Sequence, residues 1–321
     1  MNEYGAETTA DEVLADVDLS GKTILLTGGY SGIGREAARA MAAKGAHVII
    51  AGRDADKLAS ESEALAHETG AAIDTLQVDL ASLDSVRRAG EDARRRFDSI
   101  DILVNNAGVM ACPKATTQDG FERQFGTNHV GHFALTSELW PLLENGRNRR
   151  IVNLSSRAHH IAPVDLDDIH FEHRDYDKWV SYGQSKTANV LFTVGLQDRF
   201  GGAGFTAYAV HPGGIMTNLG RHLSQDDSAE LMARIQKAAE SEGSTAPLLK
   251  TVPQGAATTC FAATADLEEG AVYCEDAHVA EVEDRSAMRG VRSYAVDRDA
   301  ADRLWARSEE LIGGTFPRPS T

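Results

Sequence analysis

Tyr182 and Lys186 stand four residues apart in the stretch S-Y-G-Q-S-K at 181–186, which an apolar run follows. If the stretch is helical, this spacing places both side chains on one face, one turn apart. A free tyrosine has a pKa of about 10, and a neighbouring ammonium group favours the phenolate and lowers that pKa. Such a pair can pass a proton to or from an alcohol or a carbonyl oxygen. The alternative is that the pair marks one face of a buried helix and nothing more.

The composition limits the possible partners and the compartment. The 321 residues carry 32 Lys and Arg against 48 Asp and Glu, a formal net charge of −16, which argues against nucleic acid or an anionic membrane surface as partner. The three cysteines, Cys112, Cys260 and Cys274, form no C-x-x-C motif, which favours a reducing cytoplasm over a disulfide framework. We find no signal-peptide pattern, and no apolar stretch approaches the roughly 20 residues of a membrane span.

A short apolar run at 23–27 leads into a glycine-rich turn, and an alanine-rich helical pattern follows at 35–44. The turn reads G-G-Y-S-G-I-G over residues 28–34, a G-x-x-x-G-x-G spacing. Glycines let the backbone approach a pyrophosphate closely, and the N-terminus of the next helix favours its negative charge. A glycine turn alone is a weak signal, but the strand–turn–helix context predicts a nucleotide phosphate site.

The second predicted strand, at 46–51, ends in Gly52-Arg53-Asp54. Many NAD-binding chains carry an acid here that bonds the ribose 2′-hydroxyl. Asp54 comes later and is better placed to cap the helix that starts at Ala55. Arg53 can instead bind a 2′-phosphate through charge-assisted hydrogen bonds, which favours NADP(H) over NAD(H). The alternative is a solvated arginine in a turn.

Further apolar runs at 73–78, 100–104, 151–154 and 204–210 alternate with helical patterns. This alternation predicts a parallel, doubly wound α/β sheet, in which ligands bind beyond the carboxyl ends of the strands. A polar or glycine-rich motif follows each of these ends: Asp79-Leu80, Asn105-Asn106-Ala107-Gly108, Ser155-Ser156 and His211-Pro212-Gly213-Gly214. A helical pattern at 121–143 includes Asn128, and a mid-helix asparagine is usually solvated or bonded to its own backbone.

In their order and spacing these motifs resemble the short-chain dehydrogenase/reductases, over roughly residues 20–275. The matching motifs are T-G-G-Y-S-G-I-G at 27–34, N-N-A-G at 105–108, Asn128, Ser156, Y-x-x-x-K at 182–186 and P-G at 212–213. Three segments, at 125–133, 153–160 and 185–192, are similar to the retinol-dehydrogenase-like subgroup, which includes many bacterial reductases of unassigned substrate. The resemblance implies an N-terminal arm at 1–20 and one Rossmann-type domain at 21–321. Its three-layer fold would hold a seven-stranded parallel sheet in the order 3-2-1-4-5-6-7.

The resemblance also implies catalytic roles. Tyr182 would be the proton donor or acceptor, and Lys186 would lower its pKa and bond the nicotinamide ribose. Ser156 would hold the substrate oxygen, and Asn128 would position a water that links Lys186 to solvent. The role of the additional chain at 157–180, between Ser156 and Tyr182, stays open.

The implied cofactor contacts follow the strand ends. Gly28, Gly32 and Gly34 would contact the pyrophosphate, and Asp79 and Leu80 would contact the adenine. Asn106 would contact the adjacent ribose, and Ile215 and Thr217 would face the nicotinamide amide and the phosphates. The remaining implied contacts are Tyr30, Ser31, Ile33, Arg53, Ala107, Gly108, Pro212 and Gly213, with Tyr182 and Lys186. We expect no metal, because the spacing of Cys274, Glu275, Asp276 and His278 matches no standard site.

The predicted reaction is hydride transfer between a nicotinamide cofactor and a lipophilic alcohol/ketone or aldehyde pair. Two alternatives remain: reduction of a C=C bond on the same scaffold, and a nucleotide-sensing protein without catalysis. The presence of Ser156, Tyr182 and Lys186 argues against a sensor, which needs no proton relay. The resemblance further implies a homodimer or homotetramer that pairs through the helix of Tyr182 and the one before it.

Residues 214–250 form a connection far longer than the usual 2–6 residues. Long connections at the ligand end of a sheet tend to be lids. This one contains a predicted amphipathic helix at 228–240, with Leu231, Met232 and Ile235 on one side. It predicts a lid over a bulky, mostly apolar substrate. The alternative is that these residues merely anchor the loop to the body of the protein.

Overall fold

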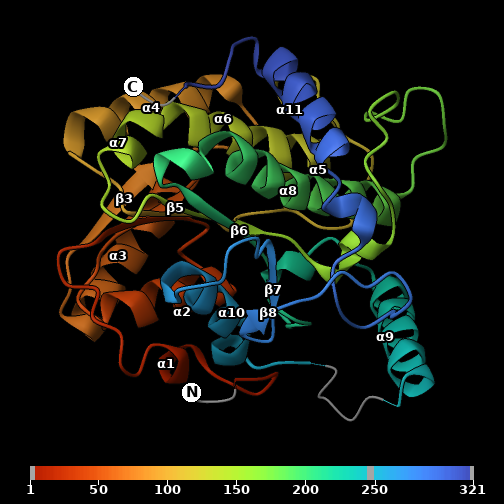
Figure 1. Ribbon diagram of the computed structural model, residues 1–321, viewed down its shortest axis with the longest axis horizontal. Coiled ribbons are helices and arrows are strands. Elements are labelled where there is room, and N and C mark those ends of the chain that lie inside the picture. Colours follow the sequence, from red (N-terminus) through yellow and green to blue (C-terminus); the bar gives the residue numbers. More distant parts are fainter. Residues whose placement is uncertain (1–3, 244–248, 319–321) are drawn as a thin grey trace.

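A single eight-stranded sheet forms the centre of the computed structural model, which describes residues 4–243 and 249–318 (Figure 1). The strand order is β3-β2-β1-β4-β5-β6-β7-β8, and neighbours among the first seven strands run parallel. The strands are β1 (Thr23–Thr27), β2 (His47–Gly52), β3 (Ile73–Gln77), β4 (Ile102–Asn105), β5 (Arg150–Leu154), β6 (Thr206–His211), β7 (Tyr273–Glu275) and β8 (His278–Val279). The predicted parallel order is therefore confirmed.

The eighth strand was not predicted. β8 pairs antiparallel with β7 through a two-residue turn, Asp276-Ala277, in which both residues have positive φ, 49° and 57°. Such turns match the twist of a hairpin and usually carry Asn or Gly. Alanine at the second position removes that signal, so the hairpin was not evident from the sequence.

Two hydrophobic cores lie on the two faces of the sheet because alternate strand residues point to opposite sides. Leu25, Ile49 and Leu103 face one side, and Ile24, Ile50 and Val104 face the other. The first core includes residues of α4 (Leu83–Arg96), α6 (Gly131–Glu138), α7 (Trp140–Glu144), α8 (Lys178–Phe200) and α11 (Arg298–Ile312). The second includes residues of α1 (Ala10–Val13), α2 (Gly32–Ala42), α3 (Ala55–Thr69) and α10 (Val252–Thr264). Figure 1 shows the resulting three layers.

The helical pattern at 121–143 is interrupted. It divides into α5 (Arg123–Phe125), a π-helical turn at Gly126–Val130, α6 and α7. A π-turn inserts one residue into the helical repeat and redirects the side chains around it, and such turns are frequent at functional sites. Asn128 lies inside this turn.

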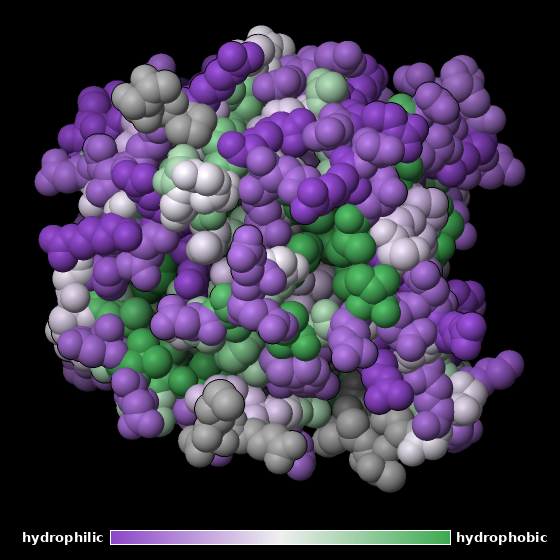
Figure 2. All heavy atoms as spheres, viewed as in Figure 1, coloured by the Kyte–Doolittle hydropathy of each residue, from purple (hydrophilic) through white to green (hydrophobic). Residues whose placement is uncertain are grey.

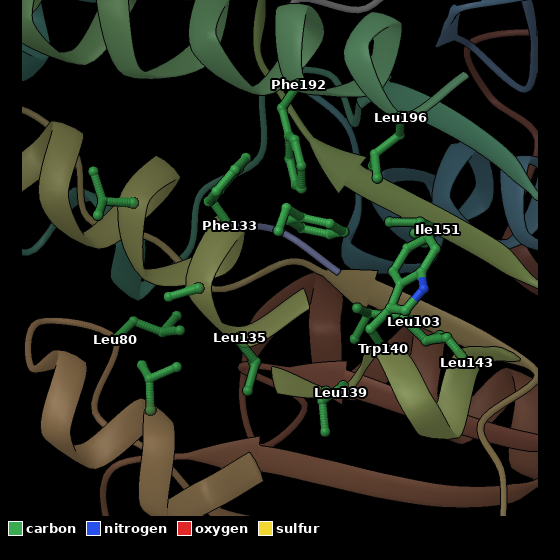
Figure 3. Close-up of a cluster of buried hydrophobic side chains, with 14 of the residues drawn as sticks. Leu80, Leu103, Phe133, Leu135, Leu139, Trp140, Leu143, Ile151, Phe192 and Leu196 are labelled. Carbon is green, nitrogen blue, oxygen red and sulfur yellow. The ribbon is translucent and has the colours of Figure 1, made fainter. Parts of the chain in front are cut away.

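The C-terminal helix α11 packs on α6 and α8. Trp305 contacts Phe133 of α6 and Phe192 of α8, with ring centroids 5.1 and 5.8 Å apart. A Cβ atom built on Gly195 would lie 2.7 Å from the Trp305 ring, so α11 approaches α8 over a residue that must stay small. Figure 3 shows Phe133 and Phe192 pointing toward each other in this core. Hydrophilic residues cover most of the outer surface in the view of Figure 2, including the region of α11.

The expected pairing of a second copy through the helix of Tyr182 and the one before it stays a prediction. Within the chain, Trp305 of α11 and Phe316 pack on Phe133 of α6 and Phe192 of α8. Within residues 4–243 and 249–318, no helix is long and apolar enough to cross a membrane.

Trp305→Ala should lower the free energy of unfolding by about 3–5 kcal/mol, because it removes a large buried aromatic side chain and leaves a cavity. Urea denaturation followed by fluorescence measures this loss. The control is Ala306→Ser, an exposed position on the same helix, for which a change within about 0.5 kcal/mol is expected. Equal losses in the two variants would contradict the account of α11.

Candidate active site

Tyr182 and Lys186 lie on α8, as the spacing predicted, and both side chains are 4% exposed. The Lys186 Nζ atom stands 5.6 Å from the centroid of the Tyr182 ring. It donates a hydrogen bond to the carbonyl oxygen of Leu154, the last residue of β5, at 2.9 Å. Asn189 Nδ2 donates to the same oxygen at 2.9 Å, and Ser155 Oγ donates to the carbonyl oxygen of Lys186. These bonds fasten the catalytic helix to the end of the central strand.

Ser156 follows directly, and its side chain is close enough to the Tyr182 hydroxyl to lower the pKa of that phenol. Its Oγ also accepts a bond from the Ala158 backbone N–H at 3.1 Å, which begins a short 3₁₀ turn at Arg157–His160. Ser156, Tyr182 and Lys186 are therefore gathered at one place, from β5 and α8. Two hydroxyl groups and an ammonium group together can hold an oxygen atom and move a proton to or from it.

Burial shifts the pKa values of Tyr182 and Lys186. It raises the pKa of Tyr182 to about 12, although the nearby Ser156 side chain opposes the rise, and it lowers the pKa of Lys186 to about 8. We had expected Lys186 to lower the pKa of Tyr182. In the polypeptide itself desolvation outweighs that effect, because the ammonium points to Leu154 rather than to the phenol. Tyr182 thus carries its proton at neutral pH.

Asn128 is buried and fully bonded, which differs from the solvated or self-bonded side chain we expected. Its Oδ1 accepts from the Val109 N–H at 2.8 Å, and its Nδ2 donates to the Val109 carbonyl and to Ser185 Oγ, both at 2.9 Å. A Cβ atom on Gly108 would lie 3.1 Å from Asn128 Oδ1 and 3.7 Å from Lys186 Nζ. Asn128 therefore joins the loop after β4 to the catalytic helix beside Lys186.

The glycine turn after β1 packs against the N-N-A-G turn after β4. Gly28 has a φ of +71°, and a Cβ atom there would come within 2.9 Å of Asn106 Nδ2 and 3.2 Å of the Ala107 backbone. Asn106 Nδ2 donates to the carbonyl oxygen of Thr27 at 2.7 Å. Asn106 thus fixes the turn through its side chain, a role that its predicted place beside the ribose did not include.

Thr27 opens the glycine-rich motif, but the sequence analysis assigned no role to its side chain. Its Oγ1 accepts from the backbone N–H groups of Asn106 and Ala107 and contacts His132 Nε2, each at 2.9 Å. The other ring nitrogen of His132 contacts the Asn128 carbonyl oxygen at 2.9 Å. A chain of polar contacts therefore runs from the glycine turn to Asn128. The signal available in the sequence was a threonine at the end of a predicted strand, directly before Gly28. The structure shows that this threonine is fully buried.

The start of α2 can accept a phosphate. Ser31 occupies its N-cap without a side-chain hydrogen bond, and no acidic residue stands in the first turn. Its first N–H groups are thus left to an anion, at the positive end of the helix dipole. Gly32 has a φ of +56°, and a Cβ atom there would lie 3.4 Å from the Thr217 side chain. The residues present therefore fit a dinucleotide pyrophosphate between the glycine turn and Thr217.

The other predicted cofactor residues surround this turn. Tyr30 packs against Gly52 at the end of β2, and Ile33 and Ile215 both approach Gly255 of α10. Gly213 has a φ of +100° and lies against the Lys250 side chain, beside the half-buried Pro212. Asp79 accepts from the Ala81 N–H at 3.0 Å, and Leu80 is turned toward Gly131 of α6. Arg53 is exposed, and no carboxylate among the described residues pairs with it.

The segment before α8 is bonded to the loop after β4 and to α5. Tyr176 donates to the Cys112 carbonyl oxygen at 3.0 Å and to Glu122 at 3.2 Å, and Gln124 donates to Tyr176 at 2.9 Å. The additional chain at 157–180 is thereby joined to the loop after β4 and to α5. In the described ranges, no three His, Cys, Asp or Glu side chains form a group that could hold a metal.

Comparison with known proteins places this geometry in a family. Residues 22–228 match the profile described as short chain dehydrogenase. The chain is 42% identical over 310 residues to a "Probable oxidoreductase" of Streptomyces lividans, covering 92% of this chain and 99% of that protein. The chain belongs to the short-chain dehydrogenase family. It is thus an NAD(P)-dependent oxidoreductase acting on CH–OH groups.

Two further proteins are similar to this short-chain dehydrogenase over most of its length. Retinol dehydrogenase 13 of Homo sapiens is 37% identical over 304 residues, which cover 93% of this chain and 87% of that protein. A solved structure from Mycobacterium paratuberculosis, of an uncharacterized protein, is 34% identical with a TM-score of 0.70. It covers 97% of this chain and 99% of its own, so the similarity includes the segments beyond β7.

Tyr182→Phe should lower kcat by about 10²- to 10⁴-fold, because it removes the group that exchanges a proton with the substrate oxygen. Cofactor affinity, measured by calorimetry, should stay within about twofold. Tyr176→Phe is the matched control, since it removes a hydroxyl that bonds the Cys112 carbonyl outside the Ser156–Lys186 group. A kcat for Tyr182→Phe equal to that of the control would exclude the assigned role.

Proposed function

We propose that this dehydrogenase interconverts a lipophilic alcohol with its ketone or aldehyde, and that Ser156, Tyr182 and Lys186 form its proton relay. The observation that supports this most directly is the buried Tyr182 ring with the Lys186 Nζ atom 5.6 Å from its centroid, beside a Ser156 side chain that lowers the pKa of the phenol. The contacts of Asn128 with Val109 and Ser185 support the same role by holding this group rigidly.

The chemistry of the relay follows from the protonation states. A bound nicotinamide supplies or accepts the hydride. In carbonyl reduction, Tyr182 donates its proton to the carbonyl oxygen while Ser156 Oγ holds that oxygen by a hydrogen bond. Because the pKa of Tyr182 is about 12, the phenol is ready for this direction at neutral pH. In alcohol oxidation Tyr182 must first lose its proton, so the oxidation rate should rise with pH.

Lys186 is suited to return the proton. Its pKa of about 8 lies near neutral pH, where a group exchanges protons most effectively. Its hydrogen bond to Leu154 uses one of three ammonium protons, which leaves two for a ribose hydroxyl and for a water. We propose that Asn128 orders the water on this side, since Gly108 brings Asn128 and Lys186 close together.

The segment at 214–250 supports the proposal that the substrate is bulky and apolar. Residues 244–248 of this segment lie outside the described part of the chain. The predicted helix is present as α9 (Gln225–Ser241), and Ala239 is its single buried residue. Leu231, Met232 and Ile235 are half-buried. Lys178 pairs with Asp227 near the start of α9, and Ser286 donates to Glu242 just beyond its end. A helix fastened near its ends and poorly packed between them can open and close over a substrate.

The decisive experiment is a substrate screen that follows cofactor absorbance, with NADPH and NADH in parallel and with ketones and aldehydes of increasing size. Mass spectrometry of the products separates carbonyl reduction from reduction of a C=C bond. Turnover of carbonyl compounds, best for apolar ones, is the expected result. Turnover confined to C=C bonds would overturn the proposed reaction.

We also propose a homodimer or homotetramer in the cytoplasm. Trp305 of α11 packs on Phe133 of α6 and Phe192 of α8, so α11 would lie beside any interface formed by these two helices. A reducing compartment fits the three free, buried cysteines. Static light scattering at micromolar concentration measures the oligomeric state.

NADP(H) should bind more tightly than NAD(H), because Arg53 follows β2 where an acid would select NAD(H). Arg53→Ala should weaken NADP⁺ binding by about tenfold or more and leave NAD⁺ binding nearly unchanged, as titration calorimetry can measure. Lys57→Ala removes a neighbouring exposed cation that pairs with Asp54 and serves as control. Equal affinities of the unmodified protein for both cofactors would refute the preference.

The double substitution Leu231→Ser and Ile235→Ser should lower kcat/KM mainly for large apolar substrates, by about tenfold or more, because less apolar surface covers them. A small ketone should be affected little. The control, Ala229→Ser with Ala233→Ser, changes two exposed positions of α9. An equal loss for large and small substrates, together with a lower Tm, would show that the segment is only structural.

A further inference from the structure

His159 lies in the 3₁₀ turn that follows Ser156, and the proposed proton relay does not use it. Its side chain is fully buried. A polar group that is buried without a hydrogen-bond partner costs free energy, so the nitrogens of a buried imidazole ring are normally bonded. Both ring nitrogens of His159 have a partner, and these two partners indicate what the side chain holds in place.

The ring of His159 connects Ser156 with a segment 133 positions later in the chain. Its Nδ1 atom lies 2.8 Å from the Ser156 carbonyl oxygen, and the Arg292 backbone N–H donates to Nε2 at 3.2 Å. The Tyr273 hydroxyl lies farther from Nδ1, at 3.4 Å. Burial lowers the pKa of His159 to about 3, so the ring is neutral at neutral pH. Because Nε2 accepts a hydrogen bond, the single ring proton lies on Nδ1, which donates it to Ser156.

Three hydrogen bonds from the turn converge on Ser156. Its carbonyl oxygen accepts from the His159 backbone N–H at 3.0 Å as well as from the ring, and its Oγ accepts from the Ala158 N–H at 3.1 Å. Ser156 has extended backbone angles, φ −167° and ψ 156°. The rotamer of a side chain depends on these angles, so the bonds to the carbonyl group also orient the hydroxyl group.

The turn that carries His159 is packed directly on α8. The His159 carbonyl oxygen accepts from Thr187 Oγ1 at 3.2 Å. A Cβ atom built on Gly183 would lie 2.8 Å from the Ala158 carbonyl oxygen. Thr187 and Gly183 directly follow the two α8 residues of the proposed relay. A displacement of the His159 ring would therefore move Ser156 relative to these two residues.

We propose that His159 is a positioning residue, whose Nδ1–H holds the Ser156 carbonyl group so that the Ser156 hydroxyl points at the substrate oxygen. This inference rests on the proposed function, in which Ser156 holds that oxygen. His159 acts through Ser156 rather than on the substrate. Through Nε2, the segment of Arg292 supports the ring, so a part of the chain beyond the sheet takes part in orienting the site.

Asparagine and glutamine at position 159 separate the two nitrogens. The Asn amide reaches as far as Nδ1 and can donate to the Ser156 carbonyl, whereas the Gln amide reaches as far as Nε2 and can accept from Arg292. Each variant thus loses one bond of the ring and retains the other. His159→Gln should lower kcat by about 10- to 100-fold, and His159→Asn by less than about threefold. The assay follows NADPH absorbance with the carbonyl compound that reacts fastest in the substrate screen.

NADP⁺ affinity and Tm should be similar in the two variants, which verifies that both are folded and bind the cofactor. An equal kcat in His159→Asn and His159→Gln would overturn the proposal, because the bond to Ser156 would then have no effect on the reaction.

A double-mutant cycle tests whether His159 acts through Ser156. Ser156→Ala should lower kcat by about 10²- to 10³-fold. Adding His159→Gln should then lower kcat by less than a further factor of about three, because the hydroxyl that this substitution displaces is already absent. A purely structural His159 would lower kcat by the same factor in both backgrounds, and that result would contradict the proposal.

Hydrogen–deuterium exchange tests the same bond without turnover. The backbone amides of Ala158 and His159 donate to Ser156, so their exchange reports how firmly Ser156 is held. In a peptide covering 156–161, exchange should be about tenfold faster in His159→Gln than in His159→Asn. If no carbonyl compound reacts, the proposed function fails, and exchange decides whether His159 holds Ser156. If carbonyl compounds react but the two variants have equal kcat and equal exchange, only the inference fails.

Discussion

The carbonyl oxygen of Leu154 is the point on which the site depends. It ends β5 and accepts hydrogen bonds from Lys186 and Asn189 of α8, both at 2.9 Å. A buried ammonium group is stable only if it has an acceptor, and here the strand end provides one. Because both donors lie on one helix, these bonds set the rotation of α8 and so the position of Tyr182 beside Ser156. The rest of the site is arranged around this junction.

The helix that carries Tyr182 and Lys186, α8, is tightly packed, whereas α9 is loosely packed. The proposed relay lies on the end of β5 and on α8, next to the π-turn of Asn128, whose side chain is buried and bonded to Ser185 of α8. The segment of α9, which we propose as a lid, has one buried residue in the helix and is held by polar contacts of Asp227 and Glu242. Proton transfer needs fixed distances, whereas substrate entry and release need a segment that opens at low cost. The division of packing between α8 and α9 meets both needs.

Much of the fold could be read from the sequence because glycines and strand ends mark it. The glycine turn at 28–34, the strand order and the Tyr182–Lys186 spacing are local patterns with a direct physical meaning. The hairpin of β8 was missed because Ala277 takes a positive φ without the usual Asn or Gly. The π-turn around Asn128 depends on tertiary contacts with Val109 and Ser185, which no periodicity reveals. The pKa of Tyr182 was misjudged for the same reason, since burial depends on the whole fold.

The packing of α11 on α8 also has a consequence for folding while the chain is being synthesised. Trp305 occupies the groove beside Gly195, more than 100 positions later in the chain. During synthesis at about 5–20 residues per second, β5 and α8 emerge well before residues 298–316. Until those residues arrive, Phe133 and Phe192 contact each other and His129 but lack the covering rings of Trp305 and Phe316. The catalytic helix is thus among the first parts of the site to be synthesised and among the last to be fully enclosed.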